Sequence, residues 1–437
     1  MSSLDKSLIR LMDDHPNVRR LWVALSGGLD SCVLLHLLAG LRPRLPVQVL
    51  HINHQLSPHA DQWRTHCETL AASHGFPFVC ETVEVVGAGR GLEMAAREAR
   101  YAAFERHVER GDMLLLAHHR DDQAETLLLR LLRGTGLRGL GAMAAVRPLG
   151  SGLAARPLLE HSRAELRTYA QSEDLQWVED ESNQQVDFDR NYLRHEVLPL
   201  LEKRWPDFAR RWAQTARLAR DNERLLREYA AGDLITANQR RERLGQSVAL
   251  DYLAELSELR RKAFLRHWIQ TCGFSAPQQV HLEEIDQFFE AAEDAQPRLA
   301  FGECELRRYD GRLYLLPRLT AIAQQHVPWN PVQPLILSDN SRLSAIKGSA
   351  GLRADRQYRL CLREGGERCR PHKRAHSQTL KKLLQEYHLE PWLRDRIPLI
   401  YAGDQLAAVG DLWICHDFYT DEAPAWQPVW RYRHQKA

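Results

Sequence analysis

The stretch LWVALSGGLDSCVLLHLL occupies residues 21–38 and decides the fold of this chain. Its first five residues, Leu21–Leu25, are apolar without alternation, which predicts a fully buried strand. Gly27 and Gly28 then allow a tight turn and leave backbone N–H groups exposed to a ligand. The apolar run after Ser31 predicts a helix, and the amino terminus of a helix favours anions. The stretch therefore predicts a strand, a phosphate-binding loop and a helix, in that order.

Asp30 is unexpected in an anion site, because its carboxylate would repel phosphate. A Mg²⁺ ion that bridges the carboxylate and the phosphates explains the residue. The loop is not a Walker A motif, since the chain contains no Gly-Lys pair. A plain strand-to-helix turn capped by Ser and Asp is the alternative, and the position after the first buried strand favours phosphate. SGGLDS resembles the pyrophosphate-binding loop of N-type ATP pyrophosphatases.

The rest of the first half repeats the same alternation of short apolar runs and helix-length segments. Further strands are predicted at 47–52, 78–86 and 113–117, and helices at 31–39, 61–74, 92–110 and 121–132. This spacing is typical of right-handed βαβ units around a parallel sheet, whose ligands bind at the carboxyl ends of the strands. Further along, we expect amphipathic helices at 205–229 and 253–269. Three prolines within 327–337 suggest a linker, and 352–413 reads as a small α+β module with a helix at 379–387.

The bulk composition excludes several classes of protein. The chain has 437 residues, which is two or three ordinary domains, and a formal net charge of only +2. Basic residues are nevertheless concentrated locally: Lys and Arg outnumber Asp and Glu by 15 to 9 over 203–266 and by 10 to 5 over 359–396. Eight cysteines without a C-x-x-C pair fit reduced thiols. With no signal-like start and no run of 18 apolar residues, we expect a cytoplasmic protein that spans no membrane.

A second motif, AHHRDDQAET, follows the predicted strand at 113–117. His118, Asp122 and Glu125 fall at positions i, i+4 and i+7, which is one face of a helix. Such a face at the carboxyl end of a strand suits Mg²⁺ binding, binding of a cationic substrate or base catalysis. Asp121 reads as a partner of the helix dipole. The G-x-G-x-x-G match at 134–139 follows a helix and not a strand, so it does not indicate a dinucleotide site.

The remaining motifs carry a more specific resemblance. They are HINHQLS at 51–57, AREARY at 96–101, the stretch AHHRDDQAETLLLRLLRGTGLRGL at 117–140, RPLL at 156–159, WVEDESN at 177–183, DRNYLRHEVLPLLEKRWP at 189–206 and LKKLLQEYHLEPWLRDRIPLIY at 380–401. Together with SGGLDS they resemble the tRNA(Ile)-lysidine synthetase family over essentially the whole chain. Ser57 stands where many members have Arg, so no role of that Arg is carried over. The segment 374–377 also departs from the family's Gly-Gly-Arg-Lys type.

The resemblance implies a two-step reaction. ATP adenylates the ring carbonyl oxygen of the wobble cytidine in a tRNA(Ile) with a CAU anticodon and releases pyrophosphate. The ε-amine of free L-lysine then expels AMP, which changes decoding from AUG to AUA. The implied fold is α/β: a PP-loop ATPase domain with a parallel sheet at 1–215, a mainly helical tRNA-binding domain at 216–326 and a small α+β tRNA-binding domain at 345–437.

The resemblance also assigns roles to individual residues. ATP is held by Ser26, Gly27, Gly28, Leu29, Asp30, Ser31, His51, Asn53 and His54, and Mg²⁺ by Asp30. Catalysis falls to Asp30, His118, Asp122 and Glu125, with the division between base and lysine ligand left open. It places Arg97, Arg100, Arg190 and Arg194 near the nucleotide or the tRNA. Independently of the resemblance, basic charge predicts tRNA phosphate contacts for Arg133 in its glycine-rich loop and for Lys381, Lys382, Arg394 and Arg396 in the stretch 359–396.

Several readings stay open at this point. His51 is equally well a packed histidine at the end of a strand. Arg190 and Arg194 are one turn apart and form either a phosphate clamp or a surface pair. Trp392 taken alone reads as a core residue. A tRNA thiolase of the PP-loop type and an inactive tRNA-binding paralogue are the rival functions. Thiolation needs a cysteine pair or an iron–sulfur site, and retained Asp30 and Ser31 argue against inactivity. The oligomeric state, a homodimer included, does not follow from the sequence.

Overall fold

The computed structural model describes residues 1–85, 91–179, 181, 188–290, 295–324 and 326–432. Within them the chain forms two compact units, Met1–Leu225 and Leu226–Ala437, and each is described by itself. Asp180, Ser182 and Asn183 of the WVEDESN motif lie outside the described residues. None of the described helices is both long and apolar enough to cross a bilayer.

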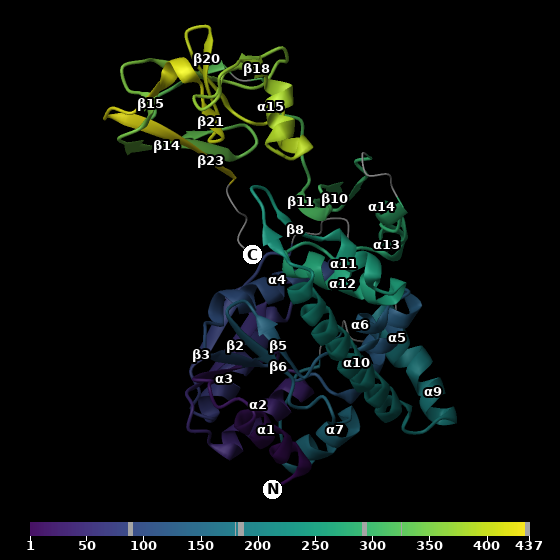
Figure 1. Cartoon of the computed structure of the whole chain (residues 1–437). Helices are drawn as coiled ribbons and strands as arrows, with labels where there is room; N and C mark the ends of the chain where they lie inside the picture. The colour runs from purple at the N-terminus through teal and green to yellow at the C-terminus, as the bar shows by residue number, and fades with distance from the viewer. Residues whose placement is uncertain (86–90, 180, 182–187, 291–294, 325, 433–437) are drawn as a thin grey trace. The chain divides into compact units, whose positions relative to one another are not determined.

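The first unit is built on a six-stranded sheet (Figure 1). Its strands are β1 (Arg20–Ala24), β2 (Val47–Asn53), β3 (Phe78–Thr82), β4 (Asp112–Leu115), β5 (Val146–Leu149) and β6 (Gly152–Ala155). The strand order is β3-β2-β1-β4-β6-β5, and every neighbouring pair is parallel except β5 with β6. The chain builds outward from β1 to β3 and then returns to the other side of β1. The gap between β1 and β4 is therefore the topological switch point, where ligands bind in such sheets.

Helices cover both faces of this sheet. They are α1 (Ser3–Asp13), α2 (Leu29–Leu41), α3 (Ala60–Ser73), α4 (Leu92–His107), α5 (Arg120–Leu132), α6 (Leu137–Leu140) and α7 (Arg163–Ser172). Successive strand residues point to opposite faces. Leu21 and Val23 of β1 thus join the core formed with α1, α2, α3 and α7 (Figure 1), while Trp22 packs with Phe104 of α4. The predicted α/β class with a parallel sheet is confirmed.

Three further helices follow the sheet: α8 (Asp189–Tyr192), α9 (Leu198–Arg204) and the long α10 (Phe208–Thr236). A single π-helical turn, Leu193–Val197, joins α8 to α9. π-helical turns are rare and often mark functional segments. Here the turn contains Arg194, whose side chain contacts Glu125 of α5.

The second unit begins with a five-stranded antiparallel sheet, ordered β7-β8-β11-β10-β9. The strands are β7 (Arg240–Arg241), β8 (Gln246–Ala249), β9 (Arg298–Phe301), β10 (Cys304–Tyr309) and β11 (Arg312–Pro317), and the helices are α11 (Leu250–Glu255), α12 (Glu258–Thr271), α13 (Gln279–Glu284) and α14 (Gln287–Glu290). The single helix expected at 253–269 is two helices, α11 and α12. The break falls at Leu256 and Ser257, whose extended backbone ends one helix and begins the next.

Two small sheets and a helix complete the second unit. One sheet has β12 (His326–Trp329), β16 (Tyr358–Cys361), β19 (Leu399–Ala402), β20 (Gln405–Val409) and β21 (Trp413–Ile414). The other has β13 (Leu335–Ile336), β14 (Ser341–Gly348), β15 (Gly351–Arg353), β22 (Tyr419–Thr420) and β23 (Ala425–Tyr432). A two-stranded pair, β17 (Arg368–Cys369) and β18 (Gln378–Thr379), precedes α15 (Leu380–Glu386).

Two expectations for this part of the chain were wrong. The stretch 327–337 is not a linker, because β12 and β13 occupy it and Pro328 pairs with Arg359. Pro328 is tolerated there because β12 is the edge strand of its sheet. Not all cysteines are free thiols either, since Cys369 and Cys415 form a disulfide. Trp392 is buried in the core of this unit, as expected. The predicted domain boundaries stay a prediction.

Candidate active site

The SGGLDS loop lies at the switch point, between the end of β1 and the start of α2. The Ser31 hydroxyl holds the turn together: Ser26 N–H donates to Ser31 Oγ (3.2 Å), and Ser31 Oγ donates to the Gly28 carbonyl (2.9 Å). Gly28 is the N-cap of α2 and makes no side-chain cap hydrogen bond. The first backbone N–H groups of α2 therefore remain for an anion.

Gly27 is the residue of this loop at which a side chain would be strained. Its φ of +86° belongs to the left-handed region, and an added Cβ would stand 3.0 Å from Val178 Cγ2 and 3.1 Å from Cys67 Sγ. The Gly27 carbonyl also accepts a hydrogen bond from Val178 N–H (2.9 Å). The loop is thus pinned to a segment about 150 residues further along the chain, a contact that the sequence pattern does not show.

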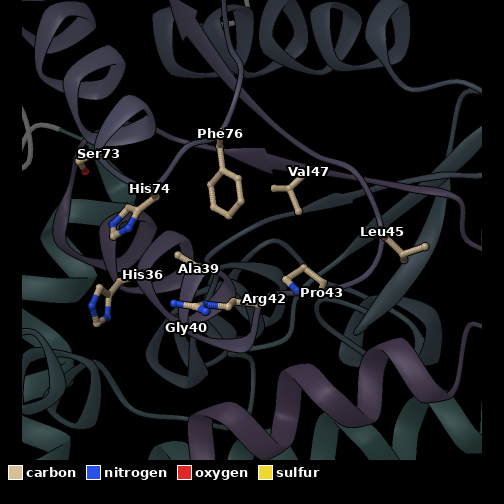
Figure 2. A pocket seen from close by; sticks show the side chains of 10 residues that line it. All are labelled: His36, Ala39, Gly40, Arg42, Pro43, Leu45, Val47, Ser73, His74 and Phe76. Atoms are coloured by element: carbon tan, nitrogen blue, oxygen red, sulfur yellow. The ribbon is translucent and has the colours of Figure 1, made fainter.

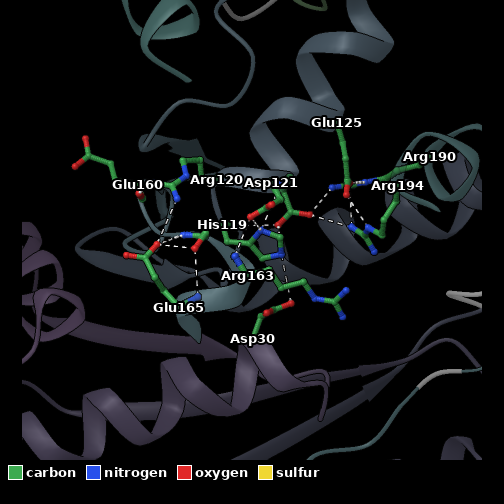
Figure 3. A network of polar contacts seen from close by, with 12 residues as sticks. Asp30, His119, Arg120, Asp121, Glu125, Glu160, Arg163, Glu165, Arg190 and Arg194 are labelled. Carbon is green, nitrogen blue, oxygen red and sulfur yellow. Dashed lines mark hydrogen bonds and ion pairs between the residues drawn. The ribbon is translucent and has the colours of Figure 1, made fainter. Parts of the chain in front are cut away.

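His119 brings the second motif to this loop (Figure 3). It is 2% exposed and is the N-cap of α5. Its Nε2 lies 3.6 Å from Asp30 Oδ2 and 3.4 Å from Asp122 Oδ2, and its Nδ1 lies 3.5 Å from Asp121 Oδ2. Burial alone would lower the pKa of His119, but the carboxylates of Asp122, Asp121 and Asp30 raise it. The imidazole thus joins the two loops, and its Nδ1 accepts a hydrogen bond from Asp122 N–H (3.4 Å).

The predicted helix face was wrong in one residue. The first residue of α5 is Arg120, so His118 lies ahead of the helix and outside the face of Asp122 and Glu125. Burial lowers the pKa of His118 to about 3, so its ring is neutral, and its buried Nδ1 has no hydrogen-bond partner among the described residues. His119 was not among the residues predicted for the site. The signal that would have found it is the N-cap geometry, since Asp122 stands three residues later, where a capping partner belongs.

The burial of the Asp30 carboxylate is only partly compensated by its neighbours. Burial raises its pKa, and the positive charge of His119 opposes that rise. Its Oδ1 is buried and has no hydrogen-bond partner among the described residues. A buried acceptor without a donor is costly, and a bound cation would satisfy it.

Asp122, Glu125, Arg190 and Arg194 form one compact ion cluster, of which Figure 3 labels Glu125 and the two arginines. Glu125 is 1% exposed and accepts hydrogen bonds from Arg190 Nε (2.7 Å), Arg194 Nε (2.6 Å) and Arg194 Nη2 (2.9 Å). Asp122 Oδ1 lies 2.7 Å from Arg190 Nη2 and 3.3 Å from Arg194 Nη2. Burial opposes ionisation of Asp122, but His119 and Arg190 outweigh it and hold its pKa well below the usual range. The two acids and two arginines therefore neutralise one another.

The end of β2 carries the residues predicted at the adenosine. Asn53 is buried, and its Oδ1 accepts from Gln55 N–H (2.9 Å). His51 is also buried, with Nδ1 at 2.8 Å from the Leu25 carbonyl, and burial lowers its pKa. Burial and the charge of Arg100 lower the pKa of His54 to about 4, and its buried Nδ1 has no hydrogen-bond partner among the described residues. Both rings are thus neutral, and their predicted contact with the adenosine stays a prediction.

Arg97 and Arg133, two of the predicted tRNA contacts in the first unit, are both exposed. Arg97 is exposed and its guanidinium lies 4.9 Å from the ring centre of Tyr101. Arg133 is exposed at the end of α5 and lies 3.2 Å from Asp189 Oδ2. Both can reach a solvent-facing ligand.

The predicted tRNA contacts in the second unit divide into two kinds. Lys381 and Lys382 are exposed on α15. Arg394 is half-buried, and its Nε donates to the Leu389 carbonyl (2.8 Å). Arg396 is 8% exposed, bonds the Thr320 carbonyl and lies 3.6 Å from buried Asp339. This burial and these contacts favour a role of Arg396 in the fold, and its predicted tRNA contact stays a prediction.

Among the described residues of the first unit, one pocket adjoins the site and another lies away from it. A pocket of about 250 Å³ is lined by His119, Asp121, Ala124, Glu125, Arg163, Arg194, Leu198, Pro199, Glu202 and Phe208. A larger pocket of about 550 Å³ (Figure 2) is lined by residues such as His36, Arg42, His74 and Phe76, at the end of α2 and ahead of β2 and β3. It belongs to the amino-terminal edge of the strands, away from the switch point.

Fold and site together define a PP-loop enzyme that uses ATP. A PP-loop domain family matches residues 2–201, a TilS substrate binding domain matches 249–314 and a TilS substrate C-terminal domain matches 358–430. The tRNA(Ile)-lysidine synthase of Serratia proteamaculans (strain 568) is 42% identical, covering 98% of this chain and 99% of its own. That of Coxiella burnetii (strain RSA 493 / Nine Mile phase I) is 40% identical and covers 91% and 89%. The chain belongs to the tRNA(Ile)-lysidine synthase family.

Proposed function

We propose that this protein ligates free L-lysine to the wobble cytidine of a tRNA(Ile) with a CAU anticodon, at the expense of ATP. The observation that supports this most is the meeting of two motifs at the switch point, with His119 Nε2 3.6 Å from Asp30 Oδ2. Relatives named tRNA(Ile)-lysidine synthase match nearly the full length. The enzyme is then a ligase that forms a carbon–nitrogen bond.

The chemistry has two balanced steps. The O2 oxygen of cytidine attacks the α-phosphorus of ATP, and pyrophosphate leaves. The ε-amine of lysine then attacks C2, loses a proton and expels AMP, which carries the former O2. The N–H groups at the start of α2, together with Ser26, bind the phosphates that become pyrophosphate. His51, Asn53 and His54 lie where the adenosine would sit.

Mg²⁺ is proposed as the cofactor, with Asp30 as its protein ligand. The buried, partnerless Oδ1 of Asp30 fits this role. No group of three or more potential metal ligands gathers in the described ranges of the chain. That agrees with Mg²⁺, which is usually held by one or two carboxylates together with the phosphates of a nucleotide. When bound, the ion would neutralise charge on those phosphates.

The ion pairs of Asp122 and Glu125 with Arg190 and Arg194 argue against a direct role of the two carboxylates in lysine binding. A lysine ammonium would have to displace a guanidinium from either carboxylate, because both are occupied. We propose instead that the two acids position Arg190 and Arg194. The exposed faces of these arginines would then bind the tRNA phosphate near the wobble base or the adenylate. Lys381 and Lys382, exposed on α15, are proposed to contact tRNA phosphates further away.

The proposal is tested by following both products. AMP and pyrophosphate release are measured with purified protein, ATP, a tRNA(Ile) transcript and lysine, each omitted in turn, and incorporation of labelled lysine into the tRNA is measured in parallel. We expect AMP release to require all components and to match lysine incorporation. Asp30→Asn should lose AMP formation while its circular dichroism stays that of the parent. The assignment would be overturned if AMP were released without tRNA, or if the tRNA carried no labelled lysine after the complete reaction.

The same assay separates the rival functions. A thiolase would form AMP with a sulfur donor in place of lysine, and an inactive paralogue would bind tRNA without consuming ATP. Family membership already favours the lysine ligase over both.

A further inference from the structure

A disulfide closes the base of an exposed loop in the second unit. Cys369 ends β17, and its sulfur is bonded to that of Cys415, 46 residues further along the chain. β17 pairs with β18, and the loop 370–377 lies between these two strands. Its second half, 374–377, is the segment that departs from the family's pattern. The disulfide thus adjoins a segment whose role the family resemblance leaves open.

The loop presents positive charge to solvent. Lys373 and Arg374 are exposed. Arg374 forms an ion pair with Glu386 (2.6 Å), but the two side chains remain 44% and 35% exposed. Exposed basic residues on a loop suit the phosphates of a nucleic acid. The loop therefore joins Lys381 and Lys382 of α15, which begins directly after β18 (Figure 1), as a candidate phosphate contact.

Short-range contacts that flank the disulfide tie the loop to the segment around Cys415. His372 N–H donates to the Ile414 carbonyl (3.0 Å), and His416 N–H donates to the Arg370 carbonyl (2.8 Å). β17 and β18 have two residues each, and so short a pair of strands is marginally stable in water. The order of the loop therefore depends strongly on the cross-link.

Helix α15 is anchored in a different way. Leu380, Leu383 and Leu384 are buried in the core of this unit. These apolar contacts hold the helix, while Lys381 and Lys382 face solvent. Opening the disulfide should thus release the loop and leave α15 in place.

We propose that Cys369 and Cys415 form a reversible thiol–disulfide switch that sets the affinity of this unit for tRNA, an inference that rests on the proposed function. In the disulfide form the loop is ordered before the tRNA arrives, and such preorganisation lowers the cost of binding. In the dithiol form the loop must become ordered on binding. The disulfide form therefore binds tRNA more tightly.

A dithiol reductant resets the switch. One thiolate of the reductant attacks Cys415 Sγ and displaces Cys369 as a thiolate, which leaves a mixed disulfide. The second thiol of the reductant then closes a cyclic disulfide and expels Cys415. The protein S–S bond is thus replaced by one in the reductant, and two electrons and two protons pass to the protein. Cys415 and Cys369 are 6% and 3% exposed, so the attack requires local opening of the loop, which strands of two residues permit.

The test compares tRNA binding by two forms of the same full chain. One sample is oxidised with diamide and the other is reduced with dithiothreitol, and alkylation with mass spectrometry verifies the state of Cys369 and Cys415. The dissociation constant for a tRNA(Ile) transcript is then measured at one fixed salt concentration. We expect the reduced form to bind about three- to tenfold more weakly. The double variant Cys369→Ser with Cys415→Ser should bind like the reduced parent after either treatment. Cys80→Ser with Cys272→Ser, which removes two half-buried free thiols, should keep the difference between the forms.

Two matched pairs of substitutions locate the effect. Lys373→Gln with Arg374→Gln should bring the affinities of the two forms together, because it removes two positive charges of the loop. Lys381→Gln with Lys382→Gln should weaken both forms alike and keep their ratio, since the core holds α15 in either form.

The outcomes separate failure of this inference from failure of the proposed function. Equal tRNA affinity of the two forms, or a disulfide that stays intact in dithiothreitol without denaturant, would overturn the switch and leave the proposed function standing. A parent that binds no tRNA in either form would overturn the proposed function and the switch with it. A difference that persists in the Lys373 and Arg374 double variant would show that the cross-link acts elsewhere and would overturn the assignment to the loop.

Discussion

Replacing Glu125 with Gln tests whether this carboxylate holds the arginines in place or binds substrate. Its two oxygens accept three short hydrogen bonds from Arg190 and Arg194, and the side chain is 1% exposed. Gln keeps one acceptor and turns an NH₂ group toward a guanidinium N–H. It also leaves Asp122 as the only anion against two guanidinium groups.

The magnitude follows from the burial of the cluster. Removing one partner of a buried ion pair costs about 3–5 kcal/mol. Because Gln retains one acceptor, we expect the lower end, about 3 kcal/mol. Glu125 lies in the unit Met1–Leu225. For a unit of this size each kcal/mol lowers Tm by about 2–4 °C, so the expected decrease is about 6–12 °C.

The assay combines melting with the two reaction steps. Tm is measured by calorimetry for the parent, for Glu125→Gln and for Glu105→Gln, an exposed control on α4. Adenylation and lysine transfer are then measured separately, below the melting temperature of the variant. We expect both steps to slow together, since misplaced arginines affect the tRNA and the adenylate alike. A Tm within about 1 °C of the parent, with only the lysine step impaired, would show that Glu125 binds lysine and would refute the reasoning.

Three further predictions concern the loop, the tRNA contacts and the second unit. Gly27→Ala should abolish ATP binding, measured by calorimetric titration, because a Cβ at φ +86° would press on Val178 and Cys67; unchanged affinity would show that the loop can rearrange. Neutralising Lys381 and Lys382 together should reduce the slope of log tRNA affinity against log salt by about one to two units, and equal slopes would exclude phosphate contacts. Arg396→Met should lower the Tm of the second unit, because it leaves buried Asp339 without its cation, and should leave the salt slope unchanged; the opposite pattern would restore Arg396 as a tRNA contact.

The local pattern was sufficient for the elements around the PP-loop. Apolar runs predicted β1, β2 and β4 to within two residues, because buried parallel strands read as continuous hydrophobic segments. The glycine pair and the helix after it predicted the phosphate loop. The helix after the second motif was predicted at 121–132 and lies at 120–132, and the error was to count His118 as part of its face. His118 precedes the helix, and His119 caps it and contacts Asp30.

The sequence by itself determined the class of the protein: a parallel α/β domain with an ATP-binding loop, in a family with specific motifs spread along the chain. Only the tertiary structure decided how the charged residues pair. Arg190 and Glu125 are 65 residues apart, so no local periodicity relates them, yet Arg190 Nε lies 2.7 Å from Glu125 Oε2. The strand order β2-β1-β4 places the loops after β1 and β4 side by side. The π-helical turn before α9 contains Arg194, which forms an ion pair with Glu125 of α5. Charge pairing depends on distance in space, and the folding topology alone sets that distance for residues so far apart in the chain.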